Sequence, residues 1–365
     1  MNVLVDLTVL ELPATGIARV VTGLYGAVAA RHRDIALSGI SRRRLRVAPP
    51  HGMHCMRIGR ALPAPLWRHF VPGHALRTSA ASFVHFPWNG GVPRLGARAG
   101  VITTLHDVLP LMIPGYFPDP AAEQQYRTAC QRDIDRSNLV VTDSEFSRGE
   151  ILRHFRIDRD PVVIPCATDI ARFTVPRREH PAPYFLYVGG LDARKSLDVL
   201  LRVFPRMVAE HALQARLIVT GSARHAPASL RALLDEGVRS GSVEFRDYVD
   251  DRELARLYGD ALALVYPSRY EGFGLPPLEA MTLGCPVITC RMTSIPEVCG
   301  DAAYYIDPAR EQSLAEALRD VAQRPELRER LRASGLSRAR VFSWARTADM
   351  FVRELHAMLD ESSPR

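Results

Sequence analysis

This 365-residue sequence has almost no lysine, and one long stretch of it has no acidic residues. Lys195 is the only lysine, and every other basic residue is an arginine. No aspartate or glutamate occurs between 35 and 106, a stretch that holds ten arginines. The formal net charge of +7 comes from the first half of the chain, which is therefore expected to meet an anionic partner. No nucleic-acid recognition motif accompanies the charge, which argues against DNA or RNA.

Long apolar runs and cysteine pairs are also missing. No run is long enough to span a bilayer, and the apolar opening is interrupted by Asp6, with no basic segment before it. The opening therefore predicts a buried first strand rather than a signal peptide. The six cysteines are scattered without a CxxC pair, which favours reduced thiols in a cytoplasmic protein and gives a zinc site little support.

The length predicts two domains, and strand-like runs alternate with helix-like segments in both halves. This alternation predicts an α/β fold of two Rossmann-like, doubly wound domains facing across a cleft, with ligands at the carboxyl ends of the strands. Expected strands lie at 2–7, 81–86, 100–107, 138–144, 161–165, 184–190, 215–221, 242–249, 262–268, 286–290 and 302–307. Expected helices lie at 16–32, 120–136, 144–155, 196–211, 250–261, 276–284, 312–340 and 344–359.

A proline- and arginine-rich segment at 173–183 predicts the linker between the domains. We expect an N-terminal domain over 1–175 and a C-terminal domain over 176–342. The helix within 343–365 is expected to pack back towards the N-terminal domain.

The single lysine follows closely on a glycine pair. The expected strand ends in Gly189 and Gly190, and the next helix is expected to begin at Ser196, a candidate N-cap. A glycine turn before a helix N-terminus presents backbone N–H groups to an anion, and Arg194 and Lys195 would add two positive charges. The pattern predicts a diphosphate site, and the plainer alternative is a solvated basic pair.

Two glutamates flank a second segment rich in glycine and proline. Glu271 and Glu279 are separated by GFGLPPL, whose glycines and prolines put Glu271 in a loop and Glu279 on a helix that starts near Pro276. An ionised carboxylate accepts hydrogen bonds, which suits the vicinal hydroxyls of ribose or a hexose. A phosphate site beside two such carboxylates predicts a nucleotide-sugar pocket rather than surface glutamates around a proline turn.

The segments EGFGLPPLEA and VGGLDARKSLD resemble the motifs of the retaining glycosyltransferases of family 4, which have the GT-B fold. The resemblance covers nearly the whole chain and is strongest at 184–300. The RKSL and HDVLPL segments look most like bacterial mannosyl- and rhamnosyltransferases of surface polysaccharide synthesis. The resemblance implies a hexosyltransferase that uses a nucleotide-sugar, with a GDP-linked donor expected first and a UDP- or dTDP-linked donor as the alternative.

For the C-terminal domain, the resemblance implies a role for each matching residue. Arg194 and Lys195 would hold the donor diphosphate, and Glu271 would contact hydroxyls of the transferred sugar. Glu279 would bind the ribose hydroxyls. The other donor contacts would come from the loop after Glu271 and from the segment lining the base, namely Phe273, Gly274, Leu275, Tyr248 and Val249.

The resemblance makes the N-terminal domain (1–175) the acceptor-binding domain and the C-terminal domain (176–342) the donor-binding domain. In the N-terminal domain it implies that Gly16 lets the backbone pass close to the phosphates. His106 would contact the donor sugar and help to organise the reacting centre, and Asp107 would orient His106 or the acceptor. Glycine turns and strand-end His-Asp pairs are also common as purely structural features. A serine-rich helix start would turn further side chains towards the cleft, namely Ser144, Ser147 and Arg148.

Retention of anomeric configuration is implied by the resemblance and not by any spacing in the sequence. The sequence holds no convincing hydrolase-type pair of catalytic carboxylates. Departure of the nucleoside diphosphate would be helped by Arg194, Lys195 and the helix dipole. The acceptor hydroxyl would attack from the same face, with its proton passing to the leaving phosphate. No metal or other cofactor is expected, because the Asp-x-Asp pairs at 133–135 and 158–160 fall in a helix and a loop away from the donor motifs.

The acid-free stretch at 35–106 interleaves Trp67, Phe70 and Val71 with arginines and histidines, which suits an anionic membrane surface or an anionic acceptor. A solvated arginine-rich face is the alternative. We expect a cytoplasmic enzyme, peripheral at the inner membrane, that extends a lipid-pyrophosphate-linked glycan. Two other classes stay open. One is a non-catalytic nucleotide-sugar or polyanion-binding module, and the other is an NAD-dependent oxidoreductase, which would want GxGxxG where only Gly16 occurs.

Overall fold

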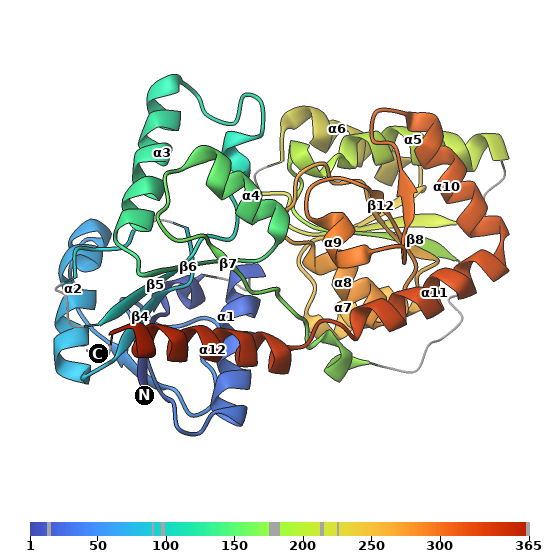
Figure 1. Ribbon diagram of the computed structural model, residues 1–365. Helices are drawn as coiled ribbons and strands as arrows, with labels where there is room; N and C mark the ends of the chain where they lie inside the picture. The colour runs from blue at the N-terminus through green and yellow to red at the C-terminus, as the bar shows by residue number, and fades with distance from the viewer. Residues whose placement is uncertain are drawn as a thin grey trace. The chain divides into compact units, whose positions relative to one another are not determined.

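The computed structural model describes residues 1–12, 16–89, 91–95, 99–174, 183–211, 215–224 and 226–362. The chain divides into two compact units (Figure 1). The first unit combines Met1–Ala167 with Phe342–Arg365, and the second is Thr168–Val341. The second unit therefore begins a few residues earlier than the boundary expected at 175. Most of the expected linker at 173–183 lies outside the described residues.

The first unit is built on a seven-stranded sheet whose strands all pair in parallel. Their order is β3-β2-β1-β4-β5-β6-β7, so the chain winds outwards in both directions from the middle, and the switch point lies between β1 and β4. The strands are β1 (Asn2–Asp6), β2 (Ala36–Ser41), β3 (His54–Arg57), β4 (Phe83–Phe86), β5 (Gly100–Thr104), β6 (Leu139–Thr142) and β7 (Val162–Val163).

Helices cover this sheet, and the last of them comes from the far end of the chain. Phe351 and Leu355 of the C-terminal helix are fully buried with Tyr25 of the first helix and Val5 of the first strand in one apolar core. The helical elements of the unit are η1 (Thr8–Glu11), α1 (Gly16–Arg31), α2 (Ala64–Ser79), η2 (Leu109–Leu111), α3 (Pro120–Asp135), α4 (Glu145–His154) and α12 (Trp344–Ser362). In Figure 1, α12 runs beside α1 and completes this core.

The second unit has a six-stranded parallel sheet in the order β10-β9-β8-β11-β12-β13. Renumbered from its own first strand, this is the order 3-2-1-4-5-6 of a Rossmann fold, with the switch point between β8 and β11. The strands are β8 (Tyr184–Val188), β9 (Arg216–Thr220), β10 (Val243–Arg246), β11 (Ala263–Tyr266), β12 (Val287–Cys290) and β13 (Tyr304–Ile306).

The helices of the second unit pack on both faces of its sheet (Figure 1), and one large apolar cluster joins four of them to the strands. They are η3 (Ile170–Phe173), η4 (Ala193–Lys195), α5 (Leu197–His211), α6 (Ala228–Arg239), α7 (Asp251–Asp260), α8 (Leu275–Thr282), α9 (Ile295–Cys299), α10 (Glu311–Gln323) and α11 (Pro325–Ala339). The single helix expected at 312–340 is two helices, because Pro325 cannot continue the first and begins the second. Among the described residues, no helix has both the length and the apolar character needed to cross a membrane.

Candidate functional site

The loops that follow β8 and β11 meet at the switch point of the second sheet. Lys195 ends η4 after β8, and Glu271 lies between β11 and α8. The Nη1 atom of Arg194 lies 3.1 Å from Oε1 of Glu271, and Nζ of Lys195 lies 3.9 Å from the same oxygen. Lys195 and Glu271 are both buried. The only lysine of the chain is thus held beside the glutamate that the sequence singles out.

Two hydroxyl groups complete the surroundings of Glu271. Tyr266 donates its hydroxyl to Oε1 at 2.7 Å and Ser268 does so at 2.6 Å, while Nζ of Lys195 donates to the Tyr266 hydroxyl at 3.2 Å. The two hydroxyls and the two cations all contact Oε1 of Glu271. Among the described residues, no hydrogen bond to Oε2 is formed. One carboxylate oxygen is therefore fixed by the protein, and the other can accept hydrogen bonds from a ligand.

The electrostatics keep Glu271 ionised. Burial alone would raise the pKa of Glu271, but Lys195 and Arg194, with the Ser268 and Tyr266 hydroxyls, lower it below its ordinary range. The pKa of Tyr266 is raised well above its usual value by burial and by the neighbouring Glu271, so the phenol keeps its proton and donates it. The site is a carboxylate between two cations, with its hydrogen-bond donors already oriented.

The loop after β12 fixes the backbone around Glu271. Ser294 donates its hydroxyl to the carbonyl oxygens of Glu271 and Phe273, at 2.8 Å each. The hydroxyl oxygen of Thr293 accepts the backbone N–H of Glu271 at 3.1 Å. Phe273 is buried, and Gly274 is the N-cap residue before α8, with a φ of +118°, a conformation that favours glycine. The segment Phe273–Leu275, expected to face the donor, is therefore held as a rigid turn.

Glycines let the loops after β8 and β9 approach each other. A Cβ on Gly189 would lie 2.8 Å from Nζ of Lys195, and one on Gly221 would lie 1.9 Å from the carbonyl oxygen of Gly189. Both glycines have positive φ. Ser196, expected as an N-cap, instead adopts a φ of +50°, which is not the extended conformation of an N-cap, because the 3-10 turn η4 leads into α5.

The other donor residues expected from the resemblance lie on the same unit. Glu279 is buried on α8, and its Oε2 accepts the hydroxyl of Tyr258 on α7 at 3.1 Å. Tyr248 and Val249 follow β10, at the carboxyl edge of the same sheet as Lys195. Tyr248 is 63% exposed and Val249 is half-buried. An exposed tyrosine at this edge is available to a flat ring, whereas Glu279 is tied to a protein hydroxyl.

His106 lies after β5 of the first unit, within a set of buried polar contacts. Its Nδ1 lies 2.7 Å from Oδ2 of Asp143 and its Nε2 lies 3.2 Å from the carbonyl oxygen of Pro87. Burial opposes a charged ring, but the Asp143 carboxylate outweighs it and raises the pKa of His106 above its ordinary value. Asp107 uses Oδ1 to accept the backbone N–H of Leu109 at 3.1 Å. Both residues of the expected His-Asp pair are engaged by the fold.

The serine-rich start of α4 is also a structural feature. Ser144 is its N-cap and accepts the backbone N–H of Ser147 at 3.0 Å, and both serines are buried rather than turned outwards. Arg148 pairs with Glu145 and Asp160 at the surface. The expectation that these side chains face a ligand therefore overlooked helix capping, which uses the same residue types.

Gly16 is the first residue of α1, and the three residues before it lie outside the described residues. Of the Asp-x-Asp pairs, Asp133 is buried and accepts the backbone N–H groups of Gly91 and Val92 at 2.9 Å each. Within the part of the chain that the structure describes, no group of three or more His, Cys, Asp or Glu side chains could hold a metal ion.

Sequence reasoning missed the uncharged residues of the site. Tyr266 and Ser268 lie in the same segment as Glu271, but a hydroxyl carries no charge pattern that would single it out. Thr293 and Ser294 come from a loop beyond the helix, and only the neighbouring strands β11 and β12 bring that loop to Glu271. The one available signal was that Tyr266 ends a buried strand, where side chains of parallel sheets line ligand sites.

The two doubly wound units and the cationic site at the second switch point define a glycosyltransferase of the GT-B fold class. Residues 182–324 match the family model described as glycosyl transferases group 1. The chain is 34% identical over 287 residues to O-antigen chain mannosyltransferase B of Escherichia coli, covering 74% of this chain and 73% of that protein. The chain belongs to this glycosyltransferase family, and its enzymatic class is that of a hexosyltransferase.

Further relatives agree in fold and in family. The serotype-specific mannosyltransferase WbdA of Escherichia coli is 25% identical over 278 residues, which cover 72% of this chain and 34% of WbdA. The structure of sucrose-phosphate synthase from Thermosynechococcus elongatus superposes with a TM-score of 0.78 at 20% identity, covering 99% of this chain and 100% of that one. This structural likeness extends over both units and confirms the fold class expected from the sequence.

Proposed function

We propose that the protein transfers a mannose- or rhamnose-type hexose from a GDP-linked donor to a lipid-linked glycan of a bacterial surface polysaccharide, with retention of configuration. The proposal rests on the cluster of Arg194, Lys195 and Glu271 at the switch point of the second sheet. Two cations beside an ionised carboxylate suit a diphosphate joined to a hydroxyl-rich ring. The identity to an O-antigen chain mannosyltransferase supports mannose and an O-antigen type of glycan.

The chemistry follows from charge. As the bond between the anomeric carbon and the diphosphate oxygen breaks, negative charge grows on the diphosphate, and Arg194 and Lys195 stabilise it. Oε2 of Glu271 accepts hydroxyls of the transferred sugar and fixes its ring. The acceptor oxygen bonds to the anomeric carbon on the face that the diphosphate leaves, and its proton passes to the diphosphate. These reaction steps need no metal ion.

Several residues support this chemistry without taking part in bond making. Phe273, Gly274 and Leu275 shape the turn that offers backbone to the donor, and Tyr248 and Val249 lie where its base would reach. Glu279, whose Oε2 accepts the hydroxyl of Tyr258, would bind the ribose hydroxyls. His106 enters as a positioning residue, because both of its ring nitrogens already have partners. Asp107 holds the loop that follows His106, and Gly16 lets the backbone pass close to the donor phosphates.

The test is a donor panel with the purified protein. GDP should raise the melting temperature most, UDP and dTDP less, and NAD not at all, since binding stabilises the folded state by about 2.7 kcal/mol at a hundred times Kd. Lys195→Ala should abolish the GDP shift, while Arg202→Ala, which removes an exposed guanidinium on α5, should keep it. Turnover of GDP-mannose with membrane extract, followed by NMR of the product anomer, tests the transfer. Stabilisation by NAD alone, or binding of GDP without turnover, would contradict the proposal.

The proposal includes peripheral contact with an anionic membrane through the arginine-rich stretch at 35–106. Phe70 and Leu66 are exposed on α2, with exposed arginines and histidines on the same helix. Trp67 and Val71, expected among the contacts, are buried in the core of the first unit, so the apolar contact rests on the other two residues. Phe70→Ser should reduce flotation with phosphatidylglycerol vesicles at least threefold. Unchanged flotation would remove the membrane from the proposal.

A further inference from the structure

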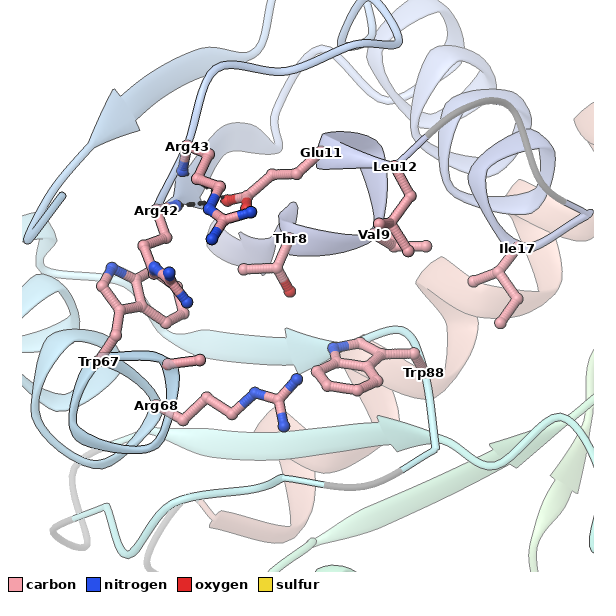
Figure 2. Close-up of a pocket in the computed structure, with 11 residues that line it drawn as sticks. Thr8, Val9, Glu11, Leu12, Ile17, Arg42, Arg43, Trp67, Arg68 and Trp88 are labelled. Atoms are coloured by element: carbon pink, nitrogen blue, oxygen red, sulfur yellow. Dashed lines mark hydrogen bonds between the residues drawn. The ribbon is translucent and has the colours of Figure 1, made fainter. Parts of the chain in front are cut away.

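The first unit has a cavity of about 340 Å³ at its own switch point, between β1 and β4. It is separate from the cluster around Glu271, and its lining comes from the elements that follow β1, β2 and β4 and from the starts of α1 and α2. Figure 2 shows these side chains around the cavity. The lining residues are Thr8, Val9, Glu11, Leu12, Ile17, Arg42, Arg43, Ala64, Trp67, Arg68 and Trp88.

One end of the cavity carries more positive than negative charge, because three arginines and one glutamate line it. Arg42, Arg43 and Arg68 line it, and among the described residues none of their guanidinium groups forms an ion pair. Nε of Arg42 is buried and has no hydrogen-bond partner there. The nearby acid, Glu11, instead accepts the backbone N–H groups of Arg42 and Arg43, at 2.6 and 2.7 Å. Buried donors without partners are rare in proteins, so this end is built to receive an anion.

The other end of the cavity is apolar and aromatic. Val9, Leu12 and Ile17 lie there, on the opposite side of the cavity from Arg42 and Arg43 in Figure 2. Leu12 is 56% exposed, so part of this wall opens to solvent. Trp88 lies between the two ends, and the guanidinium of Arg68 lies 4.3 Å from the centre of its ring. Aromatic rings beside apolar side chains suit the C–H face of a sugar ring.

We propose that this cavity binds the sugar-diphosphate end of the acceptor, with the diphosphate on Arg42, Arg43 and Arg68 and the accepting sugar against Trp88. The inference rests on the proposed function and names the acceptor's chemical class. Ile17 follows Gly16 directly, so the sugar end of the cavity adjoins the residue assigned to the donor phosphates. The arginine end of the cavity lies farther from Gly16. This order fits an acceptor whose sugar lies nearer the donor and whose diphosphate lies farther from it.

The size of the cavity adds a limit on the acceptor. A volume of about 340 Å³ is near the lower end of the roughly 300–1,000 Å³ typical of ligand pockets. This volume is enough for one sugar with its diphosphate, and any further part of the acceptor would lie outside the cavity. The accepting sugar is therefore attached directly to the diphosphate, and the enzyme acts early in chain assembly. The reaction that supplies this acceptor must be the transfer of a sugar phosphate to a lipid monophosphate.

The test uses two matched probes on the full chain, hexyl glucopyranosyl diphosphate and hexyl glucopyranoside, which differ only in the diphosphate. Two of the three tryptophans line the cavity, so intrinsic fluorescence reports binding. The diphosphate should bind at least tenfold more tightly than the glycoside. Arg43→Gln and Arg68→Gln should each weaken diphosphate binding at least fivefold, whereas Arg44→Gln, an exposed neighbour outside the cavity, should change it less than twofold.

Three outcomes would overturn the inference. They are equal binding of the two probes, equal loss in Arg43→Gln and Arg44→Gln, or arginine dependence confined to phosphatidylglycerol vesicles, which would mean that the charge reads lipid headgroups. Unchanged melting of each variant shows that it is folded. Binding of GDP separates the two proposals. If GDP stabilises the protein but the probes bind alike, only the acceptor site fails, and if the arginine-dependent probe binds but GDP does not, only the proposed donor fails.

Discussion

A single carboxylate oxygen organises the site of the second unit. Oε1 of Glu271 receives hydrogen bonds from Tyr266 and Ser268 and lies beside Arg194 and Lys195. Each group would be costly to bury alone, and together they satisfy one another. The consequence is pre-orientation, because Oε2 is aimed without any rearrangement when a sugar hydroxyl arrives.

Removing the Tyr266 hydroxyl should weaken catalysis without unfolding the protein. Tyr266→Phe deletes the donor to Glu271 and the acceptor for Lys195. Hydrogen bonds to charged groups contribute about 1.5–3 kcal/mol, so kcat should fall roughly tenfold or more. The measurement is steady-state turnover of the donor. Tyr304→Phe, which removes a hydroxyl bonded to Asp320 away from the site, should leave kcat unchanged, and a similar loss in both variants would refute the role given to Tyr266.

His106 should make stability depend on pH in a defined direction. Its pKa is raised in the folded state, so the stabilisation it gives is complete below its unfolded value of about 6.5 and is lost as pH rises through the raised pKa. His106→Asn should therefore be most destabilising near about pH 6 and progressively less so towards about pH 9. Urea unfolding across this range measures the difference. A difference that does not change with pH would contradict the assigned contact with Asp143.

Buried His85 should make stability depend on pH in the opposite direction. Burial, with a smaller contribution from His106, lowers the pKa of His85 to about 3. The folded state therefore holds it neutral between Tyr25 and Thr104. Its contribution is present above the unfolded value of about 6.5 and is lost as pH falls, at up to about 1.4 kcal/mol per pH unit. The two histidines together favour a stability maximum near neutral pH.

At the scale of elements, helices pack according to their small residues. A Cβ on Gly23 of α1 would lie 2.1 Å from the ring of Trp344 on α12, whereas one on Gly149 of α4 would meet nothing within 4 Å. The absence of a side chain at Gly23 is therefore what lets α12 lie against α1. Gly149 is not required for helix packing, and a glycine at this position lowers the stability of α4.

Two glycine-to-alanine changes should consequently act in opposite directions. Gly149→Ala should stabilise the protein by about 0.5–1 kcal/mol, since alanine favours a helix interior. Gly23→Ala should destabilise it by about 1–3 kcal/mol, since the Trp344 ring must move. Denaturant unfolding measures both. Equal effects of the two variants would mean that α12 does not need a close approach to α1.

The elements that could be predicted were those with a strong local pattern. Buried parallel strands such as β1, β6 and β9 have continuous apolar sequences, and the sequence therefore predicts them directly. The helix α2 was missed because Pro72 lies inside it, and β3 because it is a short, mostly exposed edge strand. The local sequences of α2 and β3 do not show the tertiary contacts that stabilise these two elements.

The candidate site was predictable in its charges and not in its neutral contacts. Arg194, Lys195 and Glu271 stand out because they lie in loops that contain glycines, between an expected strand and an expected helix, where anions bind. The hydroxyls that orient Glu271 come together only through strand order. The arginines of the first unit were seen as a uniform stretch. Only the structure separates Arg42, Arg43 and Arg68, which line a cavity, from Arg44, which does not.

At the scale of the whole molecule, each unit has its own core. Phe351 is fully buried in the first unit and Phe204 in the second. Phe351→Ala should cost about 3–5 kcal/mol and raise hydrogen exchange in β1 and α1 while β8 and β9 stay protected. Phe204→Ala should show the reverse pattern. Mass-resolved exchange measures this, and a uniform rise across both units in either variant would refute independent cores.

The position of α12 also bears on synthesis. Ala348, Phe351, Val352 and Leu355 belong to the core that β1 and α1 begin, yet more than three hundred residues are translated between them. On the ribosome the second unit, complete at Val341, can fold while the first still waits for its last helix. The first unit begins synthesis first but completes its folding last. Its nascent chain must be kept from aggregating until α12 emerges from the ribosome.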